Sequence, residues 1–257
     1  MGKTIRITVL LIVLVVVAGQ TWLDRVQTQS WKSPLWVGIY PLNADGSSGT
    51  QQYIANLSPD DFTSIETFFA RESHRYGLTL EEPIHIELYP QGTQLPPQLP
   101  NQAGLVGVMW WSLKMRWFAM HAARVPGRTP ARIRMFVLYH DPATLQVVPD
   151  SHGLQKGLMG VVHAFAVRSM AGSNNIVIAH ELLHTVGATD KYDFGTGAPL
   201  YPAGFGEPDS EPRYPQPTAE IMAGRRAVAP TSFEMPSSLR DVVVGPVTAD
   251  EIHWTHH

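Results

Sequence analysis

The sequence predicts an α+β fold, in which helices pack on one twisted, mixed sheet and an irregular C-terminal part follows. Between residues 34 and 187, short segments rich in β-branched and aromatic residues alternate with longer helical segments. Residues 195–217 are dense in proline and glycine, which excludes regular structure there. The length of 257 residues suits a single domain, 34–257, with an upper part (about 34–187) and a lower part (about 188–257).

Four short segments are expected to form the strands, because each is rich in β-branched or aromatic residues. Apolar and polar residues alternate in the second segment, which places His85 at the surface. His163 is read as an ordinary strand histidine and His152 as an ordinary loop histidine. The four segments are 34–42, 84–89, 132–139 and 159–167.

Three longer segments are expected to form helices. The first, 58–77, begins with Ser-Pro-Asp-Asp, which suits the positive end of a helix, and ends at a glycine. The second, 106–122, carries a cluster of tryptophans that we expect in the core, the alternative being a binding surface. The third, 176–187, is apolar on nearly every side and is expected to be buried, with 173–175 as its cap. A capping box at 248–251 predicts a short last helix.

The remaining stretches are expected to be irregular. Residues 20–33 are polar without periodicity and are read as a tether, while several Gly and Ser residues make 43–50 a flexible loop. Residues 230–238 are expected to form an irregular connection. The long 195–217 segment is a loop beside the third helix, which either shapes access to that helix or is only a solvated connection.

The third helical segment contains the residues with the clearest chemistry. His180 and His184 are four residues apart, so on a helix their side chains stack on one face, one turn apart. Two imidazoles so placed can hold one Zn²⁺, and Glu181 beside them can polarise a metal-bound water. Because the helix is expected to be buried, these polar groups need a partner, and a metal ion is the simplest one. The alternative is a buried helix whose histidines are satisfied by hydrogen bonds.

The chain after this helix offers a third ligand. Gly187 can adopt the left-handed conformation that ends a helix and turns the chain. That turn brings Asp190 toward the histidines, where a carboxylate oxygen is a suitable zinc ligand and a fourth position stays open for water. An open position is typical of a catalytic site. The rival third ligands are Asp193, Glu207, Asp209, Glu211 and Glu220.

The pattern His-Glu-x-x-His-x-x-Gly-x-x-Asp resembles the zinc motif of the metzincin clan of metallopeptidases. Most of that clan has histidine where this chain has Asp190, and the aspartate form followed by Tyr192 is similar to the snapalysin family. The segment Glu-Ile-Met-Ala-Gly at 220–224 resembles the Glu-Leu-Met-Ser-Gly of that family, which makes Met222 the expected Met-turn residue under the metal. The resemblance covers residues 159–224.

The resemblance implies a metzincin-like fold, with zinc in a cleft between the two parts of the domain. It implies a zinc-dependent endopeptidase that acts on a peptide or protein substrate. It also implies that the 159–167 strand is the sheet edge that pairs with substrate, and that 242–245 lines a specificity pocket. The implied site residues are the Zn²⁺ ligands His180, His184 and Asp190, the general base Glu181, and Tyr192 as a stabiliser of the oxyanion.

Two other functions fit the same residues. An exported zinc-binding protein would capture peptide or protein partners through these ligands without turnover. An aspzincin-type peptidase also uses two histidines and one aspartate, but its Gly-Thr-x-Asp signature is separate from the helix. Here residues 187–190 follow the helix directly, which favours the metzincin arrangement.

The N-terminus predicts export. Lys3 and Arg6 precede an apolar run at 7–19, interrupted by one threonine, which is typical of an export signal. Residues 16–18 form only a weak cleavage site, which favours an uncleaved single-pass anchor over a cleaved signal peptide. Residues 1–33 are therefore read as signal or anchor plus tether, with the catalytic domain in the extracytoplasmic space.

Composition narrows the partners further. The formal net charge is −3 and the basic residues look scattered, which argues against nucleic-acid binding. The chain has no cysteine, so disulfides and cysteine zinc ligands are excluded. The expected membrane contact is the N-terminal segment, and a monomer is expected.

Overall fold

The computed structural model describes residues 27–98, 104–155 and 157–255, together with three isolated positions nearer the N-terminus. The expected signal or anchor segment therefore lies outside the described residues, and only the end of the expected tether falls within them. In the described part of the chain, we find no helix that is long and apolar enough to cross a membrane.

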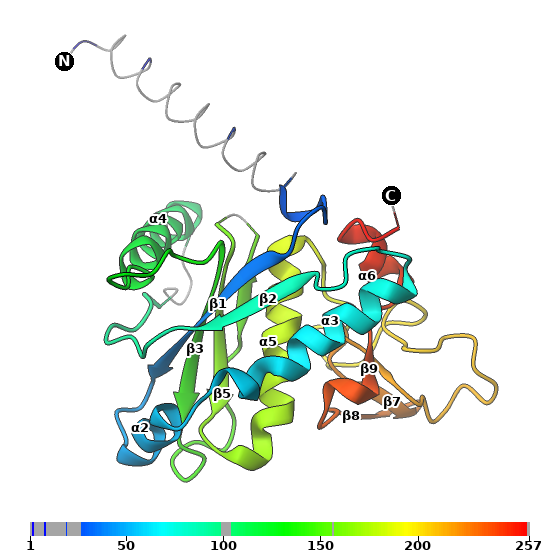
Figure 1. Ribbon diagram of the computed structural model, residues 1–257. Coiled ribbons are helices and arrows are strands. Elements are labelled where there is room, and N and C mark those ends of the chain that lie inside the picture. The colour runs from blue at the N-terminus through cyan, green and yellow to red at the C-terminus, as the bar shows by residue number, and fades with distance from the viewer. Residues whose placement is uncertain are drawn as a thin grey trace.

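Strands and helices are interspersed along the chain, as Figure 1 shows. The elements of the first part are β1 (Leu35–Asn43), α2 (Ser48–Ala55), α3 (Thr63–Arg75), β2 (Ile84–Leu88), α4 (Leu105–Ala122), β3 (Ile133–His140), β4 (His152–Leu154), β5 (Met159–Phe165) and α5 (Ala171–Val186). The elements of the C-terminal part are β6 (Ala219–Glu220), β7 (Arg226–Ala229), β8 (Ser232–Glu234), β9 (Val242–Val243) and α6 (Pro246–Glu251). Short 3₁₀ turns precede α3 (Pro59–Phe62), α5 (Arg168–Met170) and β9 (Leu239–Asp241).

One five-stranded sheet organises the larger part of the molecule. Its strand order is β2-β1-β3-β5-β4, with the first four strands parallel and β4 antiparallel to β5. All four expected strands are in it, so the expected α+β class with a mixed sheet is confirmed. The expectation that the 159–167 strand forms the sheet edge is wrong. The short strand His152–Leu154 pairs with it and takes the edge, which also moves His152 from a loop onto a strand.

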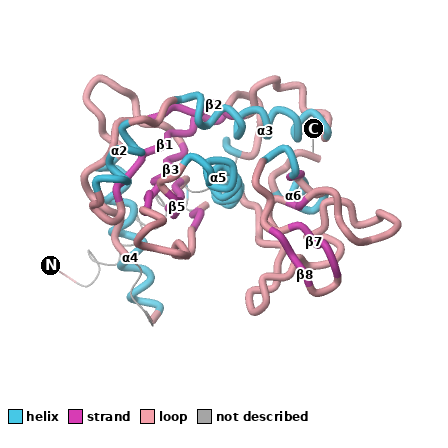
Figure 2. The backbone as a smooth tube through the Cα atoms, turned by 90° about the horizontal axis from the view of Figure 1, so that it is seen from below, coloured by secondary structure: helices cyan, strands magenta, loops and turns pink. Residues whose placement is uncertain are grey.

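Helices cover both faces of this sheet (Figures 1 and 2). Side chains of β3 alternate between the faces, as the period of a strand requires. Met135 and Val137 join the core under α3 and α5, whereas Phe136 and Leu138 join the core under α4. Figure 2 shows α5 between the sheet and the small C-terminal elements, so side chains on α5 can reach both.

Helix α4 packs on the sheet through one side only. Met115 and Phe118 are buried there, and the ring of Phe118 lies 4.9 Å from that of Phe136, centroid to centroid. The expectation that the tryptophans of this helix lie in the core is wrong for Trp110 and Trp117, which are 59% and 57% exposed. Because one side of the helix covers the sheet face, the other side faces solvent.

Helix α2 was not expected from the sequence, and α5 begins earlier than expected. The first starts within the expected loop, because Ser47 caps it by accepting a hydrogen bond from the Thr50 N–H (3.1 Å). The second starts before its expected cap at 173–175, so these residues lie in its first turns. Asn174 holds the end of β5 instead, since its side-chain amide exchanges hydrogen bonds with the Phe165 main chain.

The end of the expected tether belongs to the folded core. Thr28, Gln29 and Trp31 are buried. Trp31 donates from Nε1 to the Ile252 carbonyl (2.7 Å), and its ring meets that of Trp254 edge-on at 5.5 Å. The tether interpretation is wrong here because the C-terminal end of the chain supplies both the apolar contact and the acceptor that a buried indole needs.

The C-terminal part is mostly irregular, and residues 195–217, all of them described, contain no helix or strand, as expected. The expected irregular connection 230–238 nevertheless contributes β8, which pairs with β7 as a hairpin. Helix α6 confirms the expected last helix but begins before the predicted capping box. Thr248 donates to the buried Glu220 carboxylate (2.7 Å) instead of capping the helix.

The two parts of the domain share one hydrophobic core. Met222, Val244 and Trp254 pack in the same cluster as residues of β1 and β3. Val242 and Val244, two of the valines expected to line a pocket, are almost completely buried and fill the core instead, whereas Val243 between them is partly exposed. The C-terminal part is therefore held against α5 by apolar packing, which fixes the path of the chain beyond the two histidines.

Candidate metal centre

Helix α5 brings the two histidines onto one side. His180 and His184 lie one turn apart, with ring centroids separated by 4.7 Å and Nε2 atoms by 3.1 Å. The helix itself is firmly packed, since Ile178, Leu182 and Leu183 are almost completely buried. The two rings therefore project from a rigid support.

The chain turns back directly after α5 and brings Asp190 to both rings. Gly187 ends the helix with φ 113°, a conformation that side chains other than glycine strain to adopt. The Asp190 Oδ1 atom then lies 3.1 Å from His180 Nε2 and 3.2 Å from His184 Nε2. The structure thus brings together the three residues that the sequence pattern singled out.

Backbone carbonyls orient both imidazoles. The Nδ1 atom of His180 lies 2.9 Å from the Ile221 carbonyl oxygen, and that of His184 lies 2.8 Å from the Ala188 carbonyl oxygen. Because a carbonyl can only accept, each Nδ1 carries the proton in these hydrogen bonds. In the neutral rings, each Nε2 is left with a lone pair directed at the other two ligand atoms, the arrangement typical of metal-binding histidines.

The three ligand atoms fit a tetrahedral metal ion. Ligands about 2.0–2.2 Å from a tetrahedral zinc lie about 3.3–3.6 Å from one another, and the three separations here, 3.1, 3.1 and 3.2 Å, are only slightly shorter. The Asp190 Oδ1 atom is buried without a hydrogen-bond partner. Among the described residues, these three side chains form the one group of metal-ligand atoms close enough to hold an ion.

The charges of the site favour a cation among these atoms. Burial by itself raises the pKa of Asp190, but the contacts with His180 and His184 outweigh it and hold the pKa well below its ordinary value. Burial by itself lowers the pKa of His180, but Asp190 and Glu181 outweigh it and raise the pKa above its ordinary value. The site therefore stabilises positive charge, either a proton or a metal ion, beside the carboxylate.

Glu181 lies between the two histidines in sequence and is buried with them. Burial raises its pKa above the ordinary value, although both neighbouring imidazoles lower it in part. Its Oε2 atom is buried and has no hydrogen-bond partner within the part of the chain that the structure describes. A carboxylate with a raised pKa and a free oxygen is suited to accept and return a proton.

Tyr192 and Met222 are the other two expected site residues. Tyr192 lies two positions after Asp190 in the chain, and Met222 lies near His180 in space. Burial, together with the charges of Asp190 and Glu181, raises the pKa of Tyr192, so its half-buried hydroxyl stays protonated and can donate. Met222 is fully buried in a tight turn. The residue before it, Ile221, is the one whose carbonyl orients His180.

A buried ion pair fixes the loop that carries Asp190. Lys191 is 5% exposed and donates from Nζ to the Thr189 carbonyl (2.7 Å) and to the Glu251 carboxylate (2.8 Å). Glu251 also accepts from the Thr189 N–H (2.8 Å), so both neighbours of Asp190 are tied to α6. Sequence reasoning missed this pair, since the two partners are 60 positions apart and Glu251 fitted a capping box.

The rival third ligands lie elsewhere or have other partners. Glu220 is fully buried and accepts hydrogen bonds from the Met222 N–H (2.6 Å) and from Thr248, which shapes the Met222 turn. Asp193 accepts from the Thr196 N–H (2.8 Å) within its own turn. The remaining candidates, Glu207, Asp209 and Glu211, are exposed and outside the group of ligands.

The edge strand β4 touches α5 at a point where only glycine fits. A Cβ atom on Gly153 would lie 2.3 Å from the Glu181 carbonyl oxygen and 2.6 Å from the His184 Cβ. Real Cβ atoms do not approach so closely, so glycine is what lets the strand lie beside Glu181. Sequence reasoning missed Gly153 because residues 152–154 are too short and too polar to read as a strand.

A second pair of histidines joins β3 and β5. The His140 Nε2 atom lies 2.9 Å from the His163 Nδ1 atom. Burial lowers the pKa of His163 to about 4 and lowers that of His140 as well, so both rings are neutral at pH 7 and share one hydrogen bond. Over residues 27–98, 104–155 and 157–255, no carboxylate joins them in a group that could hold a metal.

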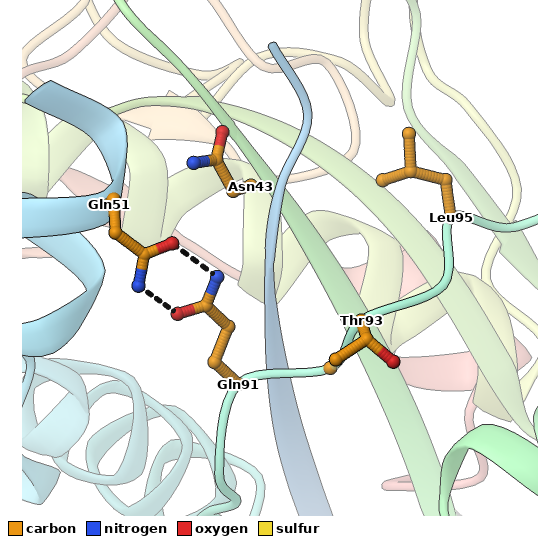
Figure 3. Close-up of a pocket in the computed structure, with 6 residues that line it drawn as sticks. Asn43, Gln51, Gln91, Thr93 and Leu95 are labelled. Carbon is orange, nitrogen blue, oxygen red and sulfur yellow. Dashed lines mark hydrogen bonds between the residues drawn. The ribbon is translucent and has the colours of Figure 1, made fainter. Parts of the chain in front are cut away.

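A pocket near the end of β1 offers no comparable chemistry. Gln51 and Gln91 exchange two amide hydrogen bonds across it, at 2.7 and 2.9 Å (Figure 3). The polar side chains of its lining are uncharged, and none belongs to the group of metal ligands. The pocket has a volume of about 430 Å³ and is lined by Asn43, Gln51, Gln91, Gly92, Thr93 and Leu95.

The fold and the site together define a class: a mixed α/β domain with a His-His-Asp group suited to a divalent metal ion. The sequence matches no known protein-family model and no curated protein. The chemistry and geometry of the site therefore carry the functional assignment.

Proposed function

We propose that this chain is a zinc-dependent endopeptidase that hydrolyses peptide bonds in the extracytoplasmic space. The observation that carries the proposal is the convergence of His180 Nε2, His184 Nε2 and Asp190 Oδ1, at 3.1 to 3.2 Å from one another. Two imidazoles and one carboxylate, with a fourth position left for water, are typical of catalytic zinc. The surrounding motif supports a metzincin-like, snapalysin-like enzyme.

Glu181 and Tyr192 have the proposed catalytic roles. A bound zinc ion would supply an acidified water molecule and polarise the carbonyl of the scissile bond. Glu181 takes a proton from that water as the new C–O bond forms, and gives it to the amine nitrogen as the C–N bond breaks. Its raised pKa supports both transfers. The Tyr192 hydroxyl donates a hydrogen bond to the developing oxyanion.

Positioning contacts support this assignment. The carbonyls of Ile221 and Ala188 hold the two imidazoles, and the Lys191–Glu251 pair holds the loop of Asp190. Partners of this kind commonly change metal affinity by about 10–100-fold. The turn at Met222 takes the role of the Met-turn in this proposal. An extended substrate would add to the free edge of β4 rather than to the 159–167 strand.

The N-terminal sequence supports the proposed location. Lys3 and Arg6 before the apolar run at 7–19 fit an export signal or a single-pass anchor with the domain outside. The proposed substrate is a peptide or protein and the proposed state is a monomer.

Two alternatives use the same ligands. An exported zinc-binding protein without turnover would not need Glu181, and burying a carboxylate oxygen without a partner is costly, which favours catalysis. An aspzincin-type peptidase has its aspartate away from the helix. Here the turn at Gly187 joins Asp190 directly to α5, which favours the metzincin arrangement.

The test combines metal content with hydrolysis. The purified full-length chain is analysed for bound metal by mass spectrometry and incubated with casein and a mixed peptide library, with and without a chelator. We expect bound zinc, cleavage that the chelator abolishes, and recovery on adding zinc. Bound zinc without cleavage of any peptide would support the non-catalytic alternative, and a chain that binds no divalent metal would end both.

A further inference from the structure

The side of α4 that faces away from the sheet is an apolar surface. Met109, Leu113, Trp117 and Met120 follow the spacing of one helix face, and Trp110 lies next to Trp117 on it. These five side chains are 49% to 66% exposed. At about 100° per residue they fill an arc of about 100° that contains no polar side chain. We call these five residues the outer face of α4.

Basic residues border the outer face on both sides. Lys114 lies at one border, with its Nζ 5.7 Å from the ring centroid of Trp110, and Arg116 lies at the other. The side of the helix that packs on the sheet, with Met115 and Phe118, is opposite. A helix on a soluble surface normally points charged residues outward. An outward apolar face with tryptophan and basic borders is typical of helices that lie in a membrane interface.

The stretch of sequence that contains α4 carries charges of one sign. Between Glu87 and Asp141 the chain has no acidic residue, although its overall net charge is −3. The basic residues are therefore less scattered along the sequence than composition alone indicates, although Arg128 is paired with Glu87 (3.2 Å). Basic residues beside an apolar face attract anionic headgroups. The basic residues in this stretch are Lys114, Arg116, Arg124, Arg128, Arg132 and Arg134.

Helix α4 and the start of the described chain lie toward the same side of the molecule. Figure 1 shows α4 and the dark blue start of the described chain toward the top, with β7 and β8 on the other side of α5. Gln27 contacts the Arg132 side chain, just before β3. The described chain therefore begins next to the segment that joins α4 to β3.

We propose that α4 lies flat in the interface of an anionic lipid bilayer, with its outer face among the acyl chains and Lys114 and Arg116 at the headgroups. Two other occupants fit the charges less well. A second copy of this chain would bring both cations close to their own counterparts. The apolar run at 7–19 of the same chain is preceded by Lys3 and Arg6, which are also cations. This proposal is independent of the proposed hydrolysis.

The absence of cysteine from the sequence allows a direct test. Met109→Cys and Met235→Cys are made in the full-length chain, and each is labelled with a fluorophore that reports polarity. Met235 is a matched control, because it is also exposed (49%, against 66% for Met109) and follows β8. Each protein is reconstituted in vesicles of phosphatidylcholine alone or with phosphatidylglycerol, with or without lipids that carry a quencher near the headgroup.

We expect the label at position 109 to shift to the blue and to lose intensity to the lipid quencher in the anionic vesicles, while the label at 235 does neither. Molar salt, with a screening length of about 3 Å, should reduce the quenching. The double variant Lys114→Gln with Arg116→Gln, which removes the positive charge at both borders of the outer face, should reduce the quenching as well. Equal emission at the two positions would overturn the proposal. A blue shift without lipid quenching would also overturn it, because protein would then cover the outer face.

Discussion

Helices α5 and α4 are similar in length, 16 and 18 residues, and both are rich in apolar residues, yet they meet the core in opposite ways. Helix α5 buries Leu183 and Glu181 and partly buries two imidazoles. Helix α4 buries one side and exposes Met109 and Trp117. Helix α5 therefore buries polar groups, and α4 exposes apolar ones. The buried polar groups of α5 indicate the cation that we propose as their partner, and the exposed apolar groups of α4 indicate the lipid surface that we propose.

The two departures have different physical causes, so they can be tested separately. The polar groups of α5 lose their water on burial and need a compensating charge or hydrogen bond. The exposed rings of α4 keep their contact with water and gain free energy only when another apolar surface covers them. Changes in α5 should therefore act on metal binding and hydrolysis, and changes on the outer face of α4 should act on lipid contact.

The largest effect is expected from Glu181→Gln. The amide keeps the shape of the side chain but cannot accept a proton, so hydrolysis should fall by about 10²–10⁴-fold while bound metal is unchanged. Casein cleavage and metal content are measured on the same preparation. Glu234→Gln is the control, since that side chain is 60% exposed and lies on β8. Cleavage by the Glu181 variant at the parent rate would show that another group is the base.

Asp190→Ala should have the next largest effect. Removing one of three ligands should weaken zinc binding by at least about 10²-fold, which is the upper end for residues that only orient a ligand. Asp193→Ala, three positions further on, should leave zinc affinity unchanged because Asp193 serves only its own turn. Affinities are measured by competition with a chromogenic chelator. Equal losses in the two variants would move the third ligand away from Asp190.

Replacing one methionine on each side of α4 compares how much each side contributes to stability. Met115 is 1% exposed and Met109 is 66% exposed, so Met115→Ala should cost about 2–4 kcal/mol of unfolding free energy. Met109→Ala should change it by less than about 0.5 kcal/mol. Denaturant unfolding of the full-length chain in one lipid-free buffer measures both. Equal destabilisation by the two variants would mean that the outer face is covered by protein.

The smallest effect is expected when the partly buried pair His140 and His163 is exposed to acidic pH. Burial holds the pKa of His163 at about 4, below its ordinary value of 6.5. Between these values the unfolded chain binds a proton that the folded protein does not, so stability falls as the pH drops through this window. The loss should be roughly 1–2 kcal/mol, because the ring is only partly buried.

Unfolding of the His163→Gln variant at pH 7 and pH 4.5 checks this sign. The variant should lose less stability on acidification than the parent does. His85→Gln is the control, since His85 is a strand residue that is 51% exposed. An unchanged pH dependence in the His163 variant would show that the buried ring is not responsible for the loss.

Much of the site could be predicted from local sequence. The spacing of His180 and His184 needs only the period of a helix, and the return of Asp190 needs only the turn at Gly187. Two contacts that support these residues could not be predicted in this way. The Lys191–Glu251 pair and the approach of Gly153 to α5 join segments distant in sequence, which no local pattern encodes.

The fold likewise has parts that local sequence predicts and parts that it does not. The four parallel strands and the main helices were predicted, because alternating or helical periodicity is a local property. The edge strand β4 was not predicted, because three residues show no periodicity and its place depends on pairing with β5. The burial of Trp31 was not predicted either, since its partners Ile252 and Trp254 lie at the other end of the chain.

By itself, the sequence determined that this protein has a mixed α/β domain and a helix with two imidazoles and a carboxylate on neighbouring turns. Both are consequences of periodicity within a few residues. Only the tertiary structure ruled out the rival third ligands, which lie elsewhere or have other partners, and decided that Trp110 and Trp117 of α4 face outward. Those outcomes depend on which surfaces pack together, and packing between distant segments is a property of the whole chain.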